Sequence, residues 1–143
     1  SEADELVRVT LRIIDYLQPR VWFVENPSAL LRNREVMEVA RTYLLECSYC
    51  HYGRDFRKHT DIFTNAPVTL RRCSRADPCS WKQRTGGHPQ TAQAGPSHGA
   101  LGRMPGRGSL SEAYRIPEAL LEDLFQATQE GGEKLSYPKL CTR

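Results

Sequence analysis

The sequence predicts an α/β fold. Three stretches with apolar residues at helical spacing alternate with three short stretches of strand character, and strands that alternate with helices are typical of α/β sheets. The 143 residues, 39% apolar and 26% charged, are enough for one globular domain with a core. The longest apolar run, residues 21–24, is far shorter than the roughly 20 residues of a membrane span, so we expect no membrane contact.

The first predicted element is a helix over residues 3–17. Its apolar residues recur at steps of three and four, and acidic residues occupy its first turn, where the helix dipole favours negative charge. The apolar set is Leu6, Val9, Ile13, Tyr16 and Leu17. Pro19 ends the helix, and residues 21–24 are expected to form a short buried strand that is apolar on both faces.

The remaining predicted elements follow in the same alternation. Residues 33–40 have the spacing of a short helix, and residues 43–49 and 61–64 are rich in residues that favour strands. A last helix begins at Pro117, because proline suits the first position of a helix, and it ends at the glycine pair 131–132.

Residues 66–115 differ in character from the rest. They contain eight Lys or Arg against two Asp or Glu, whereas residues 1–65 contain nine against ten and residues 116–143 three against five. Gly and Pro are frequent and the periodicity vanishes, which indicates an irregular, loop-rich segment. Positive charge of this kind suits duplex DNA, because it releases counterions from the phosphates.

Glu25 and Asn26 follow the predicted strand at residues 21–24. Side chains at the carboxyl end of a strand in an open α/β sheet leave the packed layer and face a crevice, where ligands bind. A carboxyl group placed there can form a hydrogen bond to a ring nitrogen of a ligand. The alternative is local, with Glu25 in a salt bridge or cap and Asn26 in an Asx turn before Pro27.

Four motifs occur in a specific order along the chain: VWFVENPSALLR from Val21, YCHYG from Tyr49 with RKHTDIFTN from Arg57, GHPQTAQAGP from Gly87, and YRIPEAL from Tyr114. In this order and spacing they resemble the C-terminal part of DNA cytosine-5 methyltransferases, and most closely the divergent phage-type and algal members. The resemblance covers nearly the entire chain. It implies a partial Rossmann-like methyltransferase sheet with flanking helices, plus the loop-rich basic segment.

The resemblance also implies a division of the chain. Residues 1–65 correspond to the C-terminal half of the α/β catalytic domain, and residues 66–115 to a target-recognition segment. Residues 116–143 correspond to a closing helix and tail that return to the catalytic domain.

In that family a Glu engages N3 of a cytosine that has been flipped out of the duplex, and the resemblance assigns this role to Glu25 and a supporting role to Asn26. The contact makes C6 of the base open to attack by a thiolate. The family also needs a Gly-rich turn for S-adenosylmethionine and a Pro-Cys nucleophile pair, and neither precedes Glu25. Pro78-Cys79 is not that pair, because it follows no strand and lies after Glu25. The chain alone is therefore not expected to methylate DNA.

The resemblance implies DNA contacts from a basic element at Arg57 and Lys58, although Asp61 replaces the last arginine of that element. A solvated basic turn is the alternative for these two residues. In the target-recognition segment, the expected DNA-binding residues are Arg71, Arg72 and Arg84.

The five cysteines are an odd number, which does not suggest a disulfide framework. Thiolates and an imidazole in a small loop-rich segment are typical of zinc sites. The candidate ligands are Cys50, Cys73, Cys79 and His88. Two alternatives stay open: Cys47 pairs with Cys50 at the spacing of a zinc knuckle, or the cysteines are simply buried.

The expected partner is double-stranded DNA, together with a missing N-terminal half that lies upstream or in another protein chain. With no secretory signal, the setting is expected to be intracellular, in a nucleus or in the cytoplasm of a prokaryotic or virus-infected cell. The rival hypothesis is a degenerate methyltransferase remnant that serves as a structural or DNA-binding subunit.

Overall fold

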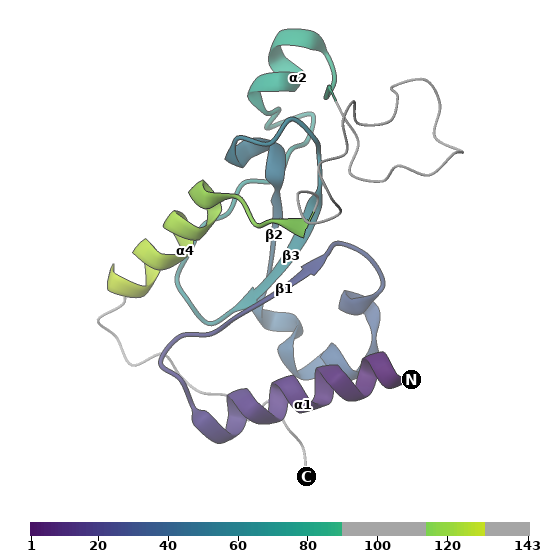
Figure 1. The fold of residues 1–143 in the computed structure, drawn as a ribbon, viewed down its shortest axis with the longest axis vertical. Helices are drawn as coiled ribbons and strands as arrows, with labels where there is room; N and C mark the ends of the chain where they lie inside the picture. Colours follow the sequence, from purple (N-terminus) through teal and green to yellow (C-terminus); the bar gives the residue numbers. More distant parts are fainter. Residues whose placement is uncertain (90–113, 131–143) are drawn as a thin grey trace.

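The computed structural model describes residues 1–89 and 114–130 (Figure 1). The helices are α1 (Glu2–Leu17), α2 (Ser80–Thr85) and α4 (Glu118–Glu130), and the strands are β1 (Phe23–Pro27), β2 (Leu44–Ser48) and β3 (His59–Thr64). Three 3-10 helices connect them: η1 (Leu31–Asn33), η2 (Glu35–Tyr43) and η3 (Tyr49–Tyr52). The helices predicted at both ends of the described chain are confirmed, and so are the positions of the three strands.

The three strands form one small sheet in the order β1-β3-β2. The central strand β3 runs antiparallel to both neighbours, so β1 and β2 run in the same direction on either side of it. The prediction of an α/β fold is thereby confirmed as a mixed domain of helices around an antiparallel sheet. All strand pairs among the described residues are antiparallel, whereas a Rossmann-like sheet is mostly parallel, so the finer expectation of a Rossmann-like sheet is not confirmed.

Helices cover both faces of the sheet (Figure 1). On one face α1 and η2 pack around Phe63, with Leu11, Trp22 and Met37 in the same cluster. On the other face α4 and η3 pack around Ile62. Phe63 and Ile62 are neighbours in β3 and point to opposite faces because side chains alternate along a strand, which is how one short strand holds two cores.

Strand β1 continues past its apolar residues. The prediction ended this strand at residue 24 and placed Glu25 and Asn26 beyond it, and this was wrong: both lie within β1, opposite Ile62 and Asp61 of β3. The prediction used side-chain polarity, whereas the ladder is made by backbone groups, which do not depend on polarity. Successive residues of a strand face opposite sides, so Glu25 and Asn26 do not share one site.

The described part of the basic segment is irregular, as predicted, apart from the short helix α2. The rest of that segment, residues 90–113, and the tail at residues 131–143 lie outside the described residues. Within the described ranges, no helix is both long enough and apolar enough to cross a membrane.

Candidate metal centre

Three cysteines and a histidine meet at one end of the sheet. Cys50 belongs to η3, Cys73 to the loop after β3, and Cys79 caps the N-terminus of α2, while His88 follows α2. The three cysteines are buried and the histidine is half-buried. The potential ligand atoms of all four residues lie within 4.8 Å of one another, so the structure brings together the complete set of ligands predicted from the sequence.

The spacing of these atoms is close to that of a tetrahedral zinc site. A tetrahedron with Zn–S bonds of about 2.3 Å separates its sulfurs by about 3.8 Å. His88 Nε2 lies 3.2 Å from Cys79 Sγ and 3.6 Å from Cys73 Sγ. Four protein ligands leave no open position for water or substrate, which is typical of a structural site and not of a catalytic one.

The thiols of the cluster shift the pKa values of one another. Burial raises the pKa of Cys50 well above its ordinary value, and hydrogen bonding to Cys79 adds to the increase. At Cys79 burial also acts to raise the pKa, but hydrogen bonds from the backbone of Lys82, from the other two thiols and from the backbone of Trp81 outweigh it, so the pKa is lowered. Burial and the nearby charges of Arg57 and Lys82 lower the pKa of His88, which keeps the imidazole neutral and able to ligate.

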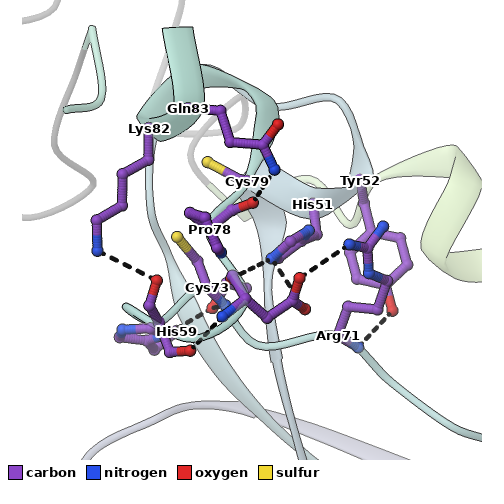
Figure 2. A network of polar contacts seen from close by, with 12 residues as sticks. His51, Tyr52, His59, Arg71, Cys73, Pro78, Cys79, Lys82 and Gln83 are labelled. Atoms are coloured by element: carbon purple, nitrogen blue, oxygen red, sulfur yellow. Dashed lines mark hydrogen bonds and ion pairs between the residues drawn. The ribbon is translucent and has the colours of Figure 1, made fainter. Parts of the chain in front are cut away.

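A network of hydrogen bonds holds the loop that carries Cys73 and Cys79 (Figure 2). The backbone N–H of Cys73 donates to Ser48 Oγ at 2.9 Å, which ties the loop to the end of β2. Lys82 Nζ donates to the carbonyl of Ser74 at 3.2 Å, and Gln83 Nε2 donates to the carbonyl of Pro78 at 2.7 Å. The ligands are therefore held by the sheet and by α2, in a segment with little apolar core of its own.

Cys47 is not part of the cluster. It lies in β2, fully buried in the core under α4, and burial followed by the charge of Glu25 raises its pKa to about 12. The zinc-knuckle alternative with Cys50 is therefore wrong. His51 is directed at Asp77 and His59 at Ser48, so neither joins the ligands.

Glu25 occupies the face of the sheet that carries α4. Tyr49 Oη donates to Glu25 Oε1 at 3.1 Å, and Lys58 Nζ lies 3.6 Å from the same oxygen. The Glu25 side chain is 27% exposed, while that of Lys58 is only 9% exposed. The Lys58 ammonium also lies 4.7 Å from the ring centre of Tyr49 and 5.6 Å from that of Tyr114. The carboxylate is thus held by buried groups and still reaches the surface.

The sequence did not indicate this arrangement. Tyr49 and Tyr114 were noted only within longer motifs, and they lie 24 and 89 positions from Glu25 along the chain. Lys58 was predicted to contact DNA, but its side chain is buried against the carboxylate and is not on the outer surface. The only signal was a lysine next to a strand, which is too common to identify a buried ion pair.

Among the described contacts, the side chain of Asn26 makes a local one: its Nδ2 donates to the carbonyl of Pro27 at 2.7 Å. This is not the Asx turn of the local alternative, because the backbone N–H of Ser28 that such a turn would use donates to the carbonyl of His59. On the same face, Asp61 is fully buried and both of its oxygens accept from Arg32. Asp61 therefore has a structural role in this fold.

The remaining basic candidates lie on the surface around the metal cluster. Arg57 is exposed, Arg71 pairs with Asp77 and Arg72 lies 3.6 Å from Glu46. The guanidinium of Arg84 stacks 4.7 Å from the ring centre of Trp81, which itself packs on the buried cysteines. The structure thus places these four arginines on the part of the chain, residues 50–88, that carries the four cluster residues.

Comparison of the chain with models of protein families, with curated proteins and with solved structures finds no match in any of the three.

Proposed function

We propose that this chain is the zinc-stabilised, DNA-facing portion of a cytosine-5 DNA methyltransferase, and that Glu25 is the carboxyl group that engages the flipped cytosine. The observation that carries the proposal is the position of this side chain, which buried Tyr49 and Lys58 hold at one oxygen while it stays 27% exposed. Part of the carboxyl group therefore stays accessible to a ligand while its orientation is fixed.

The chemical role of Glu25 follows from that geometry. Both described partners meet Oε1, which leaves Oε2 for N3 of an incoming cytosine. Because N3 is an acceptor, the carboxyl group must engage it in the protonated form, with Oε2–H as the donor. This hydrogen bond draws electron density from the ring, so C6 becomes open to a thiolate. Lys58 and Tyr49 are positioning residues in this scheme, because they restrict the carboxylate and do not touch the base.

Zinc is the metal that the cluster suits best. Three thiolates and one imidazole in a closed tetrahedral set are typical ligands of structural zinc. Holding Cys50, Cys73, Cys79 and His88 together would order the segment that carries Arg71, Arg72 and Arg84. Metal binding would thereby fix the positions of these arginines on the surface that faces duplex DNA.

S-adenosylmethionine does not fit the described residues. The methyl donor of this reaction needs a Gly-rich turn between a strand and a helix, and no such turn is found in residues 1–89 or 114–130. The donor and the nucleophilic thiolate would come from an upstream segment or from another protein chain.

The direct test is methyl transfer by a polypeptide that also contains the upstream region. Transfer to cytosine in duplex DNA is expected, and Glu25→Gln should lower it by at least about 100-fold, in the range attributed to a positioned acid or base. Glu38→Gln on η2 is the matched control, because the Glu38 side chain is 66% exposed and pairs only with Arg41 among the described contacts. Equal activity of the two variants would refute the role of Glu25.

A second candidate function is a non-catalytic DNA-binding subunit. The Lys58 ammonium beside Glu25 favours this non-catalytic function, since the ion pair gives the carboxylate a partner when no flipped cytosine is bound. In that case the chain would bind duplex DNA, and the longer polypeptide would transfer no methyl group.

A further inference from the structure

Helix α1 has two apolar faces, and the described core uses one of them. Leu11 and Ile14 are buried against the sheet, with Val7 packed beside them. A second apolar stripe is 41% to 87% exposed, and we call it the outer stripe: Leu6, Val9, Ile13, Tyr16 and Leu17. Single exposed apolar residues are normal, but a continuous stripe along one helix marks a contact surface.

A wide-open cavity of about 610 Å³ lies along the outer stripe, and its described lining consists of Val9, Arg12, Ile13, Tyr16 and Leu17. Four of these five residues are apolar or aromatic, so the cavity suits apolar side chains flanked by a few polar groups.

The end of α4 lies next to the C-terminal end of α1. Arg20 Nη2 donates to the backbone carbonyl of Thr128 at 2.7 Å. Thr128 belongs to the last turn of α4, and Arg20 follows the end of α1 by three residues. The chain that leaves α4 therefore starts close to Tyr16 and Leu17, at one end of the outer stripe.

Residues 131–143 have the length to cover the outer stripe. Thirteen extended residues span up to about 45 Å, whereas the 16 residues of α1 span about 24 Å. The segment reads GGEKLSYPKLCTR, so two glycines that permit a sharp change of direction precede Leu135, Tyr137 and Leu140.

The charges of the two segments are complementary as well. Residues 131–143 contain three Lys or Arg against one Glu, whereas α1 contains four acidic residues against two arginines. Complementary charge guides two surfaces into one register.

We propose that residues 131–143 dock on the outer stripe of α1 within the same chain, with their apolar side chains in the cavity. This assignment is independent of the methyltransferase proposal and of the metal. It gives the exposed apolar stripe an occupant that is always present.

Native Cys141 provides the test. Val9→Cys, Ile13→Cys and Tyr16→Cys are made singly in the full chain, and Arg8→Cys on the same helix, but off the stripe, is the matched control. A disulfide forms only when the two Cα atoms approach within about 4.4–6.8 Å. Under mild oxidation we expect a disulfide to Cys141 in at least one stripe variant, at a yield that does not depend on protein concentration and is several-fold above the control.

Two outcomes would overturn the proposal. One is a yield at all three stripe positions no higher than that of Arg8→Cys. The other is disulfide-linked dimers whose yield rises with protein concentration, because that result assigns the outer stripe to a second copy of the chain. Cys141→Ser in each variant identifies the partner thiol.

A second measurement does not depend on the register of the tail. A chain that ends at Glu130 should bind a fluorescent apolar dye several-fold more strongly than the full chain, because the outer stripe is uncovered. Unchanged dye binding would also contradict the docking.

Discussion

Cys79 and Cys47 show how neighbours decide the chemistry of two identical side chains. Both are buried, but Cys47 is surrounded by residues of η3, β3 and α4, and its raised pKa keeps it an unreactive thiol. Cys79 receives backbone N–H groups at the start of α2 and faces two further thiols and His88, and its pKa is lowered. Only the second environment favours a thiolate that can bind a metal.

The first prediction concerns these two cysteines. Mass spectrometry under native conditions should find one zinc ion on the wild-type chain, and none on Cys79→Ser because a ligand is lost. Cys47→Ala should retain the ion, since Cys47 lies outside the cluster. A metal-free wild-type chain would refute the zinc site, and loss of the ion from both variants would point to a general effect on folding.

A second prediction at the scale of the residue concerns Arg32 and Asp61. Asp61 is fully buried, and Arg32 is the described group that pairs with both of its oxygens. Arg32→Met would leave a buried charge without a partner, so we expect the free energy of unfolding to fall by about 3 kcal/mol, the lower end of the range for buried pairs, because 24% of the Arg32 side chain is exposed.

Urea denaturation followed by circular dichroism measures this loss. Arg41→Met is the matched control, because Arg41 pairs with an exposed Glu38 and its removal should change stability by less than about 0.5 kcal/mol. Adding Asp61→Asn to Arg32→Met should restore part of the loss, because the uncompensated charge is removed. Equal effects of the two single variants would contradict this account of the pair.

At the scale of the element, α4 is the piece that closes the second core. Leu120 and Leu124 are buried beside Ile62 of the sheet, while Phe125 on the same helix is 62% exposed. The sequence predicted this helix, but it did not show which of its apolar residues the core would bury. The four-residue spacing of Leu120 and Leu124 defines the buried side, and Phe125 is turned about 100° from Leu124.

The prediction for this element compares those two sides of α4. Leu120→Ala should lower the free energy of unfolding by about 2–5 kcal/mol, since it removes a fully buried side chain and leaves a cavity. Phe125→Ala should change it by less than about 0.5 kcal/mol. Chemical denaturation checks both variants, and a larger effect at Phe125 would mean that an undescribed segment covers it.

At the scale of the whole molecule, the Cys and His cluster and the arginines predicted to contact DNA lie at one end of the domain. Arg57, Arg71, Arg72 and Arg84 lie on segments that the Cys and His ligands join. Apolar burial contributes little there, because the core clusters lie on the sheet. If the cluster binds a metal, its removal should therefore affect this end of the molecule first.

The prediction at this scale is the salt dependence of DNA binding. Affinity for duplex DNA should fall steeply with salt, and replacing Arg71 and Arg72 together by Gln should reduce the slope of log K against log salt by about 2, about one for each phosphate contact. Arg41→Gln on η2 is the control, and it should leave the slope unchanged. Fluorescence anisotropy measures the slopes. Absence of binding at low salt would remove DNA as a partner.

The sequence by itself determined the first and last helices, the positions of the three strands, the candidate ligands of the cluster and the asymmetry of charge. These features depend on local periodicity or on the few residue types that bind zinc. The choice between Cys47 and Cys73, the exact span of β1 and the burial of Lys58 against Glu25 were decided only by the tertiary structure. Each depends on backbone pairing or on contacts between residues far apart in the chain. A local sequence pattern does not predict which distant groups will come into contact.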